Sequence, residues 1–131
     1  LWSSEKRLNF NSTGLDSGAV SKTGNTIVES ITLDLLIEKY GEVDLLKLDI
    51  EGAELEVLKH TKSLSKVKNI YIEMEMSVNQ DYEDEILKIL KNNSFKYYIR
   101  STTRYLNPNE MFNSKNQITY YIHIFAKKNE K

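Results

Sequence analysis

The stretch VDLLKLDIEGAELEVL, residues 43–58, constrains the fold more than any other part of this chain. It opens with the apolar run 43–50, whose length suits a β-strand buried on both faces of a sheet. Asp49, Glu51 and Gly52 end that run, and apolar residues then recur at helical spacing. A strand that passes through an acidic turn into a helix forms half of a βαβ unit. Because open α/β sheets bind ligands at the carboxyl ends of their strands, we expect Asp49 to occupy a functional position.

Helices and strands are predicted to alternate along the rest of the chain. Residues 11–26 are rich in Ser, Thr, Asn and Gly and are predicted to form a loop. The other predicted elements are a short strand near residues 7–10, a helix over 33–40 capped by Thr32 and ended by Gly41, a helix over 53–64, a strand over 69–76, a helix over 82–90 that ends at Asn92 or Asn93, and strands over 95–100 and 118–126. The turn signal of residues 107–109 separates the last two strands, which could form an antiparallel pair. This order predicts an α/β sheet with a reversed terminal strand.

The words ITLDLLIEKY and KLDIEGAELEVLK also carry a family resemblance. They resemble the core motif of FkbM-type S-adenosylmethionine-dependent methyltransferases, in which a strand with Lys-x-Asp-x-Glu-Gly-Ala-Glu follows a Thr-Leu-Asp helix. The resemblance runs from about residue 31 to residue 75. It implies a Rossmann-like class I methyltransferase fold, with this chain as the C-terminal part: parallel strands, crossover helices and a reversed terminal strand.

Two carboxylates are the main candidates for chemistry. Asp49 and Glu73 lie towards the carboxyl ends of successive predicted strands, so parallel pairing of those strands would make both face one crevice. Either carboxylate could take the proton of an acceptor hydroxyl during methyl transfer. Alternatively, these two residues and Glu75 could hold Mg²⁺ through oxygen ligands. The structural alternative is that Glu51 is a favourable charge at a helix start and that Glu73 or Glu75 points into water.

Neighbouring residues of the motif complete the candidate site. Lys47 lies in mid-strand between two leucines and needs a carboxylate partner or a route to the surface, so it joins Asp49 and Glu73 as a candidate catalytic residue. The candidate cofactor-binding residues are Asp49, Glu51 and Gly52. The missing Cβ of Gly52 permits a positive φ or the close approach of a ligand.

The two histidines are interpreted as structural. His60 stands where the resembled family commonly has Gly, and we read it as a helix-end residue. His123 alternates with Ile122 and Ile124, as expected of a residue within a strand.

The resemblance implies an S-adenosylmethionine-dependent O-methyltransferase that acts on a hydroxyl of a saccharide, polyketide or similar metabolite. Such enzymes bind the cofactor through a Gly-rich turn after their first strand and an acidic residue after their second strand. Neither feature precedes residue 43, and the chain starts at Leu1 rather than Met. We therefore expect residues 1–131 to be a single incomplete α/β domain without its N-terminal cofactor-binding portion, and to bind S-adenosylmethionine weakly alone. The alternative is a non-enzymatic interaction module that retains the second half of the fold.

Composition limits the partners. A formal net charge of −1 argues against general binding of nucleic acid or anionic membranes, and the absence of cysteine excludes disulfides. No apolar run is long enough to cross a bilayer and no signal-peptide pattern opens the chain, so a cytoplasmic protein with a small-molecule partner is expected. If no strand precedes it in the sheet, the 43–50 strand would be an exposed edge through which two copies could pair.

Overall fold

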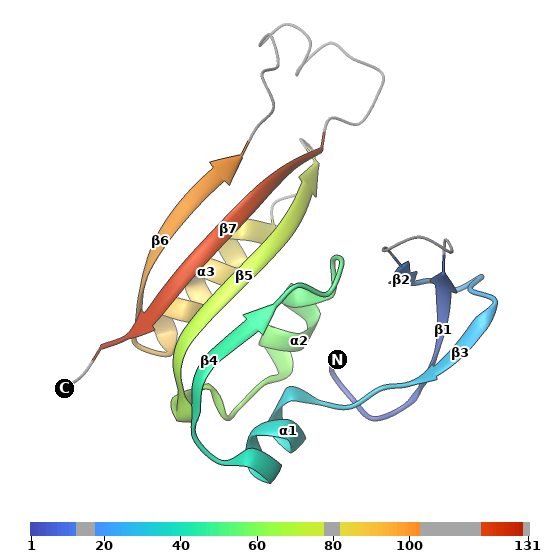
Figure 1. The fold of residues 1–131 in the computed structure, drawn as a ribbon, viewed down its shortest axis with the longest axis horizontal. Helices are drawn as coiled ribbons and strands as arrows, with labels where there is room; N and C mark the ends of the chain where they lie inside the picture. Colours follow the sequence, from blue (N-terminus) through green and yellow to red (C-terminus); the bar gives the residue numbers. More distant parts are fainter. Residues whose placement is uncertain (13–17, 78–81, 103–118, 130–131) are drawn as a thin grey trace, which may run out of the picture.

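The computed structural model describes residues 1–12, 18–77, 82–102 and 119–129, which form a four-stranded sheet with helices and a separate three-stranded sheet (Figure 1). The elements in chain order are β1 (Arg7–Ser12), β2 (Gly18–Val20), β3 (Thr26–Glu29), α1 (Leu33–Tyr40), β4 (Val43–Leu48), α2 (Glu54–His60), the 3₁₀ turn η1 (Leu64–Lys66), β5 (Val67–Ser77), α3 (Tyr82–Asn92), β6 (Phe95–Thr102) and β7 (Thr119–Lys128).

The larger sheet has the strand order β4-β5-β7-β6. β4 and β5 are parallel neighbours in a register that sets Lys47 opposite Tyr71, and α2 connects them. This confirms the strand–helix–strand unit expected from the sequence. β7 runs antiparallel to both β5 and β6, with His123 opposite Glu73. The carboxyl ends of β4 and β5 therefore point in the same direction, and β5 continues to Ser77, past the Ile72 that pairs with the last residue of β4.

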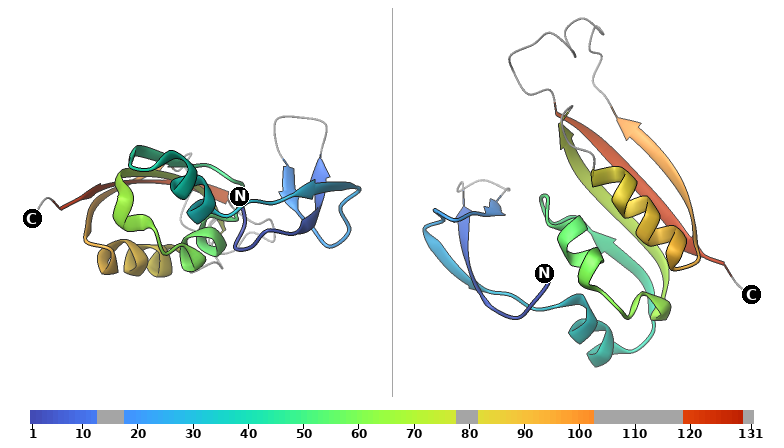
Figure 2. Two further views of the ribbon diagram at one scale, coloured as in Figure 1. Left: turned by 90° about the horizontal axis from the view of Figure 1, so that it is seen from below. Right: turned by 180° about the vertical axis from the view of Figure 1, so that it is seen from behind.

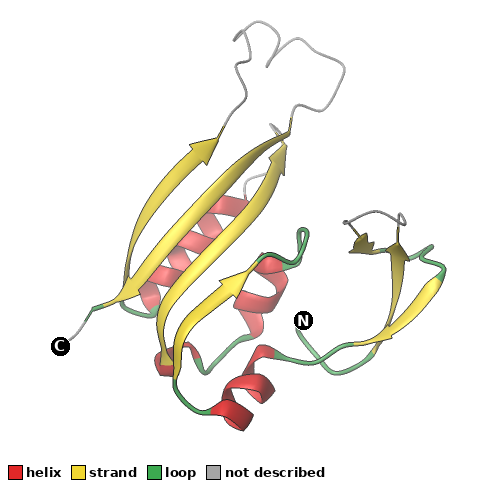
Figure 3. Ribbon diagram, in the orientation of Figure 1, coloured by secondary structure: helices red, strands yellow, loops and turns green. Residues whose placement is uncertain are grey.

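Helices α2 and α3 cover one face of this sheet (Figures 2 and 3). The core lies between these helices and the sheet, and Leu33 and Ile37 of α1 also belong to it. β5 shows why, because its side chains alternate between the two faces. Ile70, Ile72 and Met74 are buried against the helices, while Tyr71 and Glu73 project from the other face and are only half-buried. The same strand thus builds the core with one set of residues and a solvent-facing surface with the other.

Within the described residues no helix packs on the opposite face, where Leu45, Tyr98 and Phe125 remain exposed. The expectation that the 43–50 strand is buried on both faces is therefore wrong. Leu45 is 63% exposed, Asp44 and Lys47 are also exposed, and only Leu48 is fully buried. β4 packs its inner face on the helices and lies at the edge of the sheet.

The predicted 33–40 helix and its cap are confirmed. Thr32 Oγ1 accepts a hydrogen bond from the Leu35 amide, and Gly41 ends the helix at a φ of 80°. The predicted helix over 53–64 is too long, since α2 ends at His60. Beyond α2, the backbone amides of residues 62 and 63 donate hydrogen bonds to the Asp34 carboxylate of α1. Tertiary bonds of this kind offer the backbone an alternative to another helical turn.

The N-terminal part forms a small antiparallel sheet in the order β2-β1-β3. The predicted loop over residues 11–26 is therefore partly wrong, since residues 18–20 pair with β1. The left-handed residue after α3 is Ser94, with a φ of 64°, rather than Asn92 or Asn93. The turn signal at 107–109 lies outside the described residues. Within the described part of the chain, no helix is both long enough and apolar enough to cross a membrane.

Candidate functional site

The turn between β4 and α2 holds two residues in the left-handed region. Glu51 has a φ of 54° and Gly52 a φ of 92°, a conformation that costs roughly 1–2 kcal/mol for a residue with a Cβ. Glu54 braces this turn, since its Oε1 accepts a hydrogen bond from the Ile50 amide at 2.8 Å and its side chain is almost fully buried. Strained backbone that is held by its surroundings is common at binding and catalytic sites.

Lys47 and Asp49 form an ion pair at the end of β4. Their Nζ and Oδ2 atoms lie 2.9 Å apart, and both side chains remain partly exposed. The hydrogen bond and charge of Asp49, with a further contribution from the charge of Glu73, raise the pKa of Lys47. Glu73 is therefore close enough to the pair to share its electrostatic field. The charges of both candidate carboxylates thus act on the Lys47 ammonium, while their sharing of one crevice stays a prediction.

A hydrogen-bonded chain surrounds Glu73 on the face without helices. The Tyr71 hydroxyl lies 3.2 Å from Glu73 Oε2 and 2.7 Å from His123 Nδ1. His123 Nε2 lies 3.3 Å from the Thr102 hydroxyl, so the chain crosses β5, β7 and β6. Partial burial and the charge of Glu73 raise the pKa of Tyr71, which keeps its hydroxyl protonated.

Several carboxylates gather around the β4–α2 turn. Burial and the charges of Asp49 and Glu75 raise the pKa of Glu51, with smaller contributions from Glu54 and Glu73. No group of three or more acidic or histidine side chains within the described residues is arranged to hold a metal ion. The geometry therefore gives no support to the magnesium site considered for Asp49, Glu73 and Glu75.

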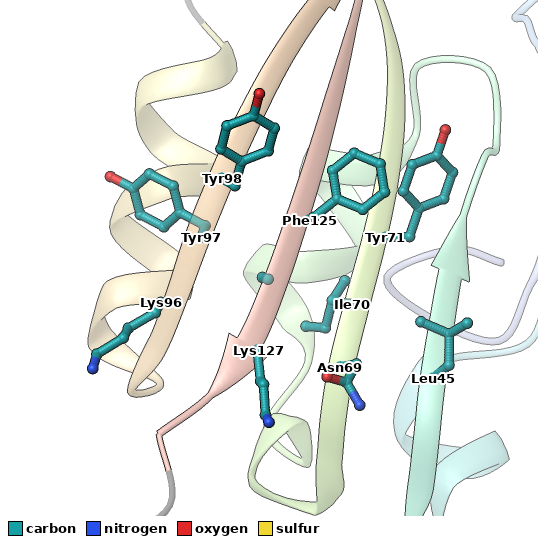
Figure 4. Close-up of a pocket in the computed structure, with 10 residues that line it drawn as sticks. Leu45, Asn69, Ile70, Tyr71, Lys96, Tyr97, Tyr98, Phe125 and Lys127 are labelled. Atoms are coloured by element: carbon teal, nitrogen blue, oxygen red, sulfur yellow. The ribbon is translucent and has the colours of Figure 1, made fainter.

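A row of aromatic rings continues from this cluster across the face without helices (Figure 4). The rings of Tyr71 and Phe125 have centroids 4.9 Å apart, and those of Phe125 and Tyr98 lie 6.5 Å apart. Together with Leu45 of β4 they line a shallow cavity of about 330 Å³. The row and the polar cluster share Tyr71, so they form one continuous surface.

A second cavity, of about 430 Å³, lies at the β4–α2 turn. Asp49 and Glu51 supply carboxylates on one side, and apolar residues of the small sheet, including Leu8, Phe10 and Val28, supply the other. The cavity thus joins an apolar wall to two carboxylates, a combination typical of small-molecule sites.

The sequence identified Lys47, Asp49, Glu51, Gly52 and Glu73, and the structure places all five at the carboxyl end of β4 or on β5 beside it. Glu75 is exposed, and His60 ends α2 as expected, with Nδ1 2.8 Å from the Glu56 carbonyl oxygen.

The sequence missed Tyr71, His123, Thr102 and the bracing role of Glu54. Spacing alone puts Tyr71 and Glu73 on one face of β5. His123 joins them only through the register of β5 with β7, which the sequence does not reveal.

Glu51→Asn is expected to stabilise the protein by about 0.5–1 kcal/mol at neutral pH. Asn tolerates the left-handed conformation better than Glu, and the exposed charge adds only a small, screened repulsion. Because folding raises the pKa of Glu51, the folded state binds this proton more tightly than the unfolded state, so ionisation destabilises the fold. The charge-dependent part of the gain should therefore appear as the pH rises through the range between the ordinary and the raised pKa, and vanish below it.

Urea unfolding of wild type and variant across that pH range measures this gain. Glu5→Asn, at an exposed position outside the cluster, is the control and should leave stability unchanged. A Glu51→Asn protein that is less stable than wild type at neutral pH contradicts the prediction.

Comparison with known proteins gives one family match. The model of the family described as Methyltransferase FkbM domain matches residues 3–97, which include β1 to β5, α3 and the whole β4–α2 turn. Neither a curated protein nor a solved structure matches the chain significantly.

Proposed function

The chain belongs to the FkbM methyltransferase family, and from this premise we propose that it is an S-adenosylmethionine-dependent O-methyltransferase of the Rossmann-like class I fold. The observation that carries the proposal is the polar cluster at the carboxyl end of β4, where this strand ends beside the middle of β5. There, Lys47, Asp49 and Glu73 share one electrostatic field at the edge where open α/β sheets bind their ligands.

The cofactor is assigned to the β4–α2 side of the cluster. When bound, S-adenosylmethionine supplies a methyl group made electrophilic by its positively charged sulfur. The carboxylates of Asp49 and Glu51 suit hydroxyls or a positive charge, and Gly52 leaves open space where a Cβ would stand. The ion pair with Lys47 at 2.9 Å restricts the orientation of the Asp49 carboxylate.

The acceptor hydroxyl is assigned to Glu73. The Asp49 carboxylate is held in an ion pair by the ammonium of Lys47, 2.9 Å away, so Glu73 is the carboxylate proposed to take the hydroxyl proton. Glu73 is bonded through Oε2 to the neutral hydroxyl of Tyr71. Transfer would exchange the bond between the methyl carbon and the sulfonium sulfur for a bond to the acceptor oxygen, leaving a neutral thioether, and the carboxylate of Glu73 would take the hydroxyl proton.

The chemistry around Glu73 supports the proposed acceptor class. A hydroxyl-bearing metabolite, such as a saccharide or a polyketide, matches the carboxylates and the ammonium, which bind hydroxyls by hydrogen bonds. The aromatic row beside Tyr71 supplies an amphipathic surface for the apolar part of such a ligand. Magnesium has no role in this proposal.

The test is methyl transfer by the natural gene product. The protein is incubated with S-adenosylmethionine labelled in the methyl carbon and a panel of saccharides and polyketide alcohols, with matched amines and thiols as controls. We expect label in methyl ethers and not in methylamines or thioethers. Transfer to nitrogen or sulfur alone rejects the acceptor class, while the absence of both cofactor binding and transfer favours a non-enzymatic interaction module.

A further inference from the structure

We propose that Tyr71 and His123 are positioning residues that hold one oxygen of Glu73, so that its other oxygen is presented to the acceptor hydroxyl. The inference deepens the proposed function and rests on it, since Glu73 is the group proposed to take the hydroxyl proton. It concerns residues on β5 and β7 that lie outside the Lys-x-Asp-x-Glu-Gly motif.

The direction of the hydrogen bonds follows from counting protons. The Tyr71 hydroxyl has one hydrogen but lies within bonding distance of both Glu73 Oε2 and His123 Nδ1. An ionised carboxylate only accepts hydrogen bonds, so Tyr71 must donate to Glu73. The short contact of 2.7 Å between Tyr71 and His123 is then a hydrogen bond only if Nδ1 carries the ring proton and donates it to the Tyr71 oxygen.

The contact between His123 and Thr102, at the far end of the hydrogen-bonded chain, agrees with this direction. With the ring proton on Nδ1, Nε2 of a neutral imidazole is an acceptor, and the Thr102 hydroxyl at 3.3 Å can donate to it. Every donor from Thr102 to Tyr71 then points towards Glu73. The His123 side chain is only 19% exposed and is fixed by its place in β7, between β5 and β6.

These hydrogen bonds restrict the Glu73 side chain to one orientation. Oε2 is occupied by Tyr71, and within the described residues Oε1 makes no hydrogen bond. Without Tyr71, the Glu73 carboxylate could rotate towards the Lys47 ammonium, whose pKa is raised in part by the charge of Glu73. Misplacement of a catalytic group by about 1 Å can lower a rate by about a hundredfold.

Ring ¹⁵N chemical shifts test the direction of the chain without any substrate. The protein has two histidines, and Nδ1 of His60 faces a carbonyl oxygen, which only accepts, so His60 serves as a reference with its proton on Nδ1. At a pH of about 8.5, where an unperturbed imidazole is neutral, we expect His123 also to carry its proton on Nδ1. In Glu73→Ala, the Tyr71 hydroxyl is released to donate to Nδ1, and the His123 proton should move to Nε2.

Matched variants separate this effect from general disturbance of the sheet. Glu75→Ala removes the next carboxylate of β5 on the same face, and Tyr98→Phe removes a hydroxyl from the exposed aromatic row. Neither should move the His123 proton, and no variant should change His60. A His123 ring with its proton on Nε2 in the wild-type protein overturns the proposal, as does a proton that stays on Nδ1 in Glu73→Ala.

A kinetic comparison tests the consequence for catalysis. With an acceptor from the labelled panel, Tyr71→Phe should lower kcat about ten- to a hundredfold while leaving the KM for S-adenosylmethionine unchanged. Tyr40→Phe, the same change at an exposed tyrosine of α1 outside the site, should leave both constants unchanged. Equal kcat values for Tyr71→Phe and wild type reject the positioning role even if the proton is on Nδ1. If the ring protons behave as expected but the protein transfers no methyl group, the proposed function is rejected instead.

Discussion

Glu73→Gln is expected to lower the rate of methyl transfer by about a hundredfold or more. General-base catalysis typically contributes at least that much, and an amide cannot accept the hydroxyl proton at neutral pH. The substitution keeps the size of the side chain, and the amide oxygen can still accept the hydrogen bond from Tyr71. The chemical step, measured by single-turnover transfer from labelled cofactor, should therefore slow while the fold and cofactor affinity are retained.

Two further variants decide which carboxylate is the base. Glu75→Gln changes an exposed residue two positions along the same strand and should leave the rate near normal. Asp49→Asn should also reduce turnover severely, because it breaks the 2.9 Å ion pair with Lys47 and removes a carboxylate from the cofactor side. In that variant we expect the KM for S-adenosylmethionine to rise, whereas Glu73→Gln should leave it unchanged.

The opposite pattern would assign the base to Asp49. A rate within a few-fold of wild type in Glu73→Gln, together with a loss confined to kcat in Asp49→Asn, contradicts the roles proposed here. Addition of a chelator to the same assay provides an independent check, because transfer through these residues alone should continue at an unchanged rate.

The sequence predicted the part of the site that is local along the chain. The order of apolar strand, acidic turn and helix located Asp49, Glu51 and Gly52, and the next strand supplied Glu73. Parallel pairing of consecutive strands joined by one helix is strongly constrained by the right-handed crossover, so the proximity of Asp49 and Glu73 could be foreseen. These relations need no knowledge of residues far away in the chain.

The rest of the site depends on long-range register. His123 lies fifty residues beyond Glu73, and only the insertion of β7 between β5 and β6 sets the two opposite each other. A strand in which His123 alternates with buried isoleucines can present the histidine to either face of a sheet, and local spacing does not decide which. Interpreting His123 as structural therefore overlooked its contact with Tyr71.

Tertiary contacts also explain the two errors in the description of β4 and α2. The apolar run 43–50 suggested burial on both faces, yet Leu45 lies on the face that the described helices leave open. The apolar spacing through residue 64 suggested a longer helix, but the Asp34 carboxylate captures the amides that follow Thr61. The intrinsic preferences of residues for helix or strand are weak compared with such tertiary contacts.

Ile72→Ala is expected to destabilise the protein by about 2–5 kcal/mol. The Ile72 side chain is fully buried in the centre of the sheet, and truncation leaves a cavity between β5 and the helices. That loss is a large share of the 5–15 kcal/mol that is typical of a folded domain. Urea unfolding followed by circular dichroism measures it.

The matched control is Ile27→Ala in β3, the same chemical change at a side chain that is 68% exposed. It should shift stability by less than about 0.5 kcal/mol, because little apolar surface is lost from the interior. Similar losses for the two variants would mean that β5 does not form the core as described.

Ile72 also separates Tyr71 from Glu73 along β5, and a shift of the strand register by one residue would turn both side chains away from Lys47. Burial of Ile72 therefore fixes the face on which the polar cluster forms, and Ile72→Ala should weaken the preference of His123 for a proton on Nδ1 as the strand loosens.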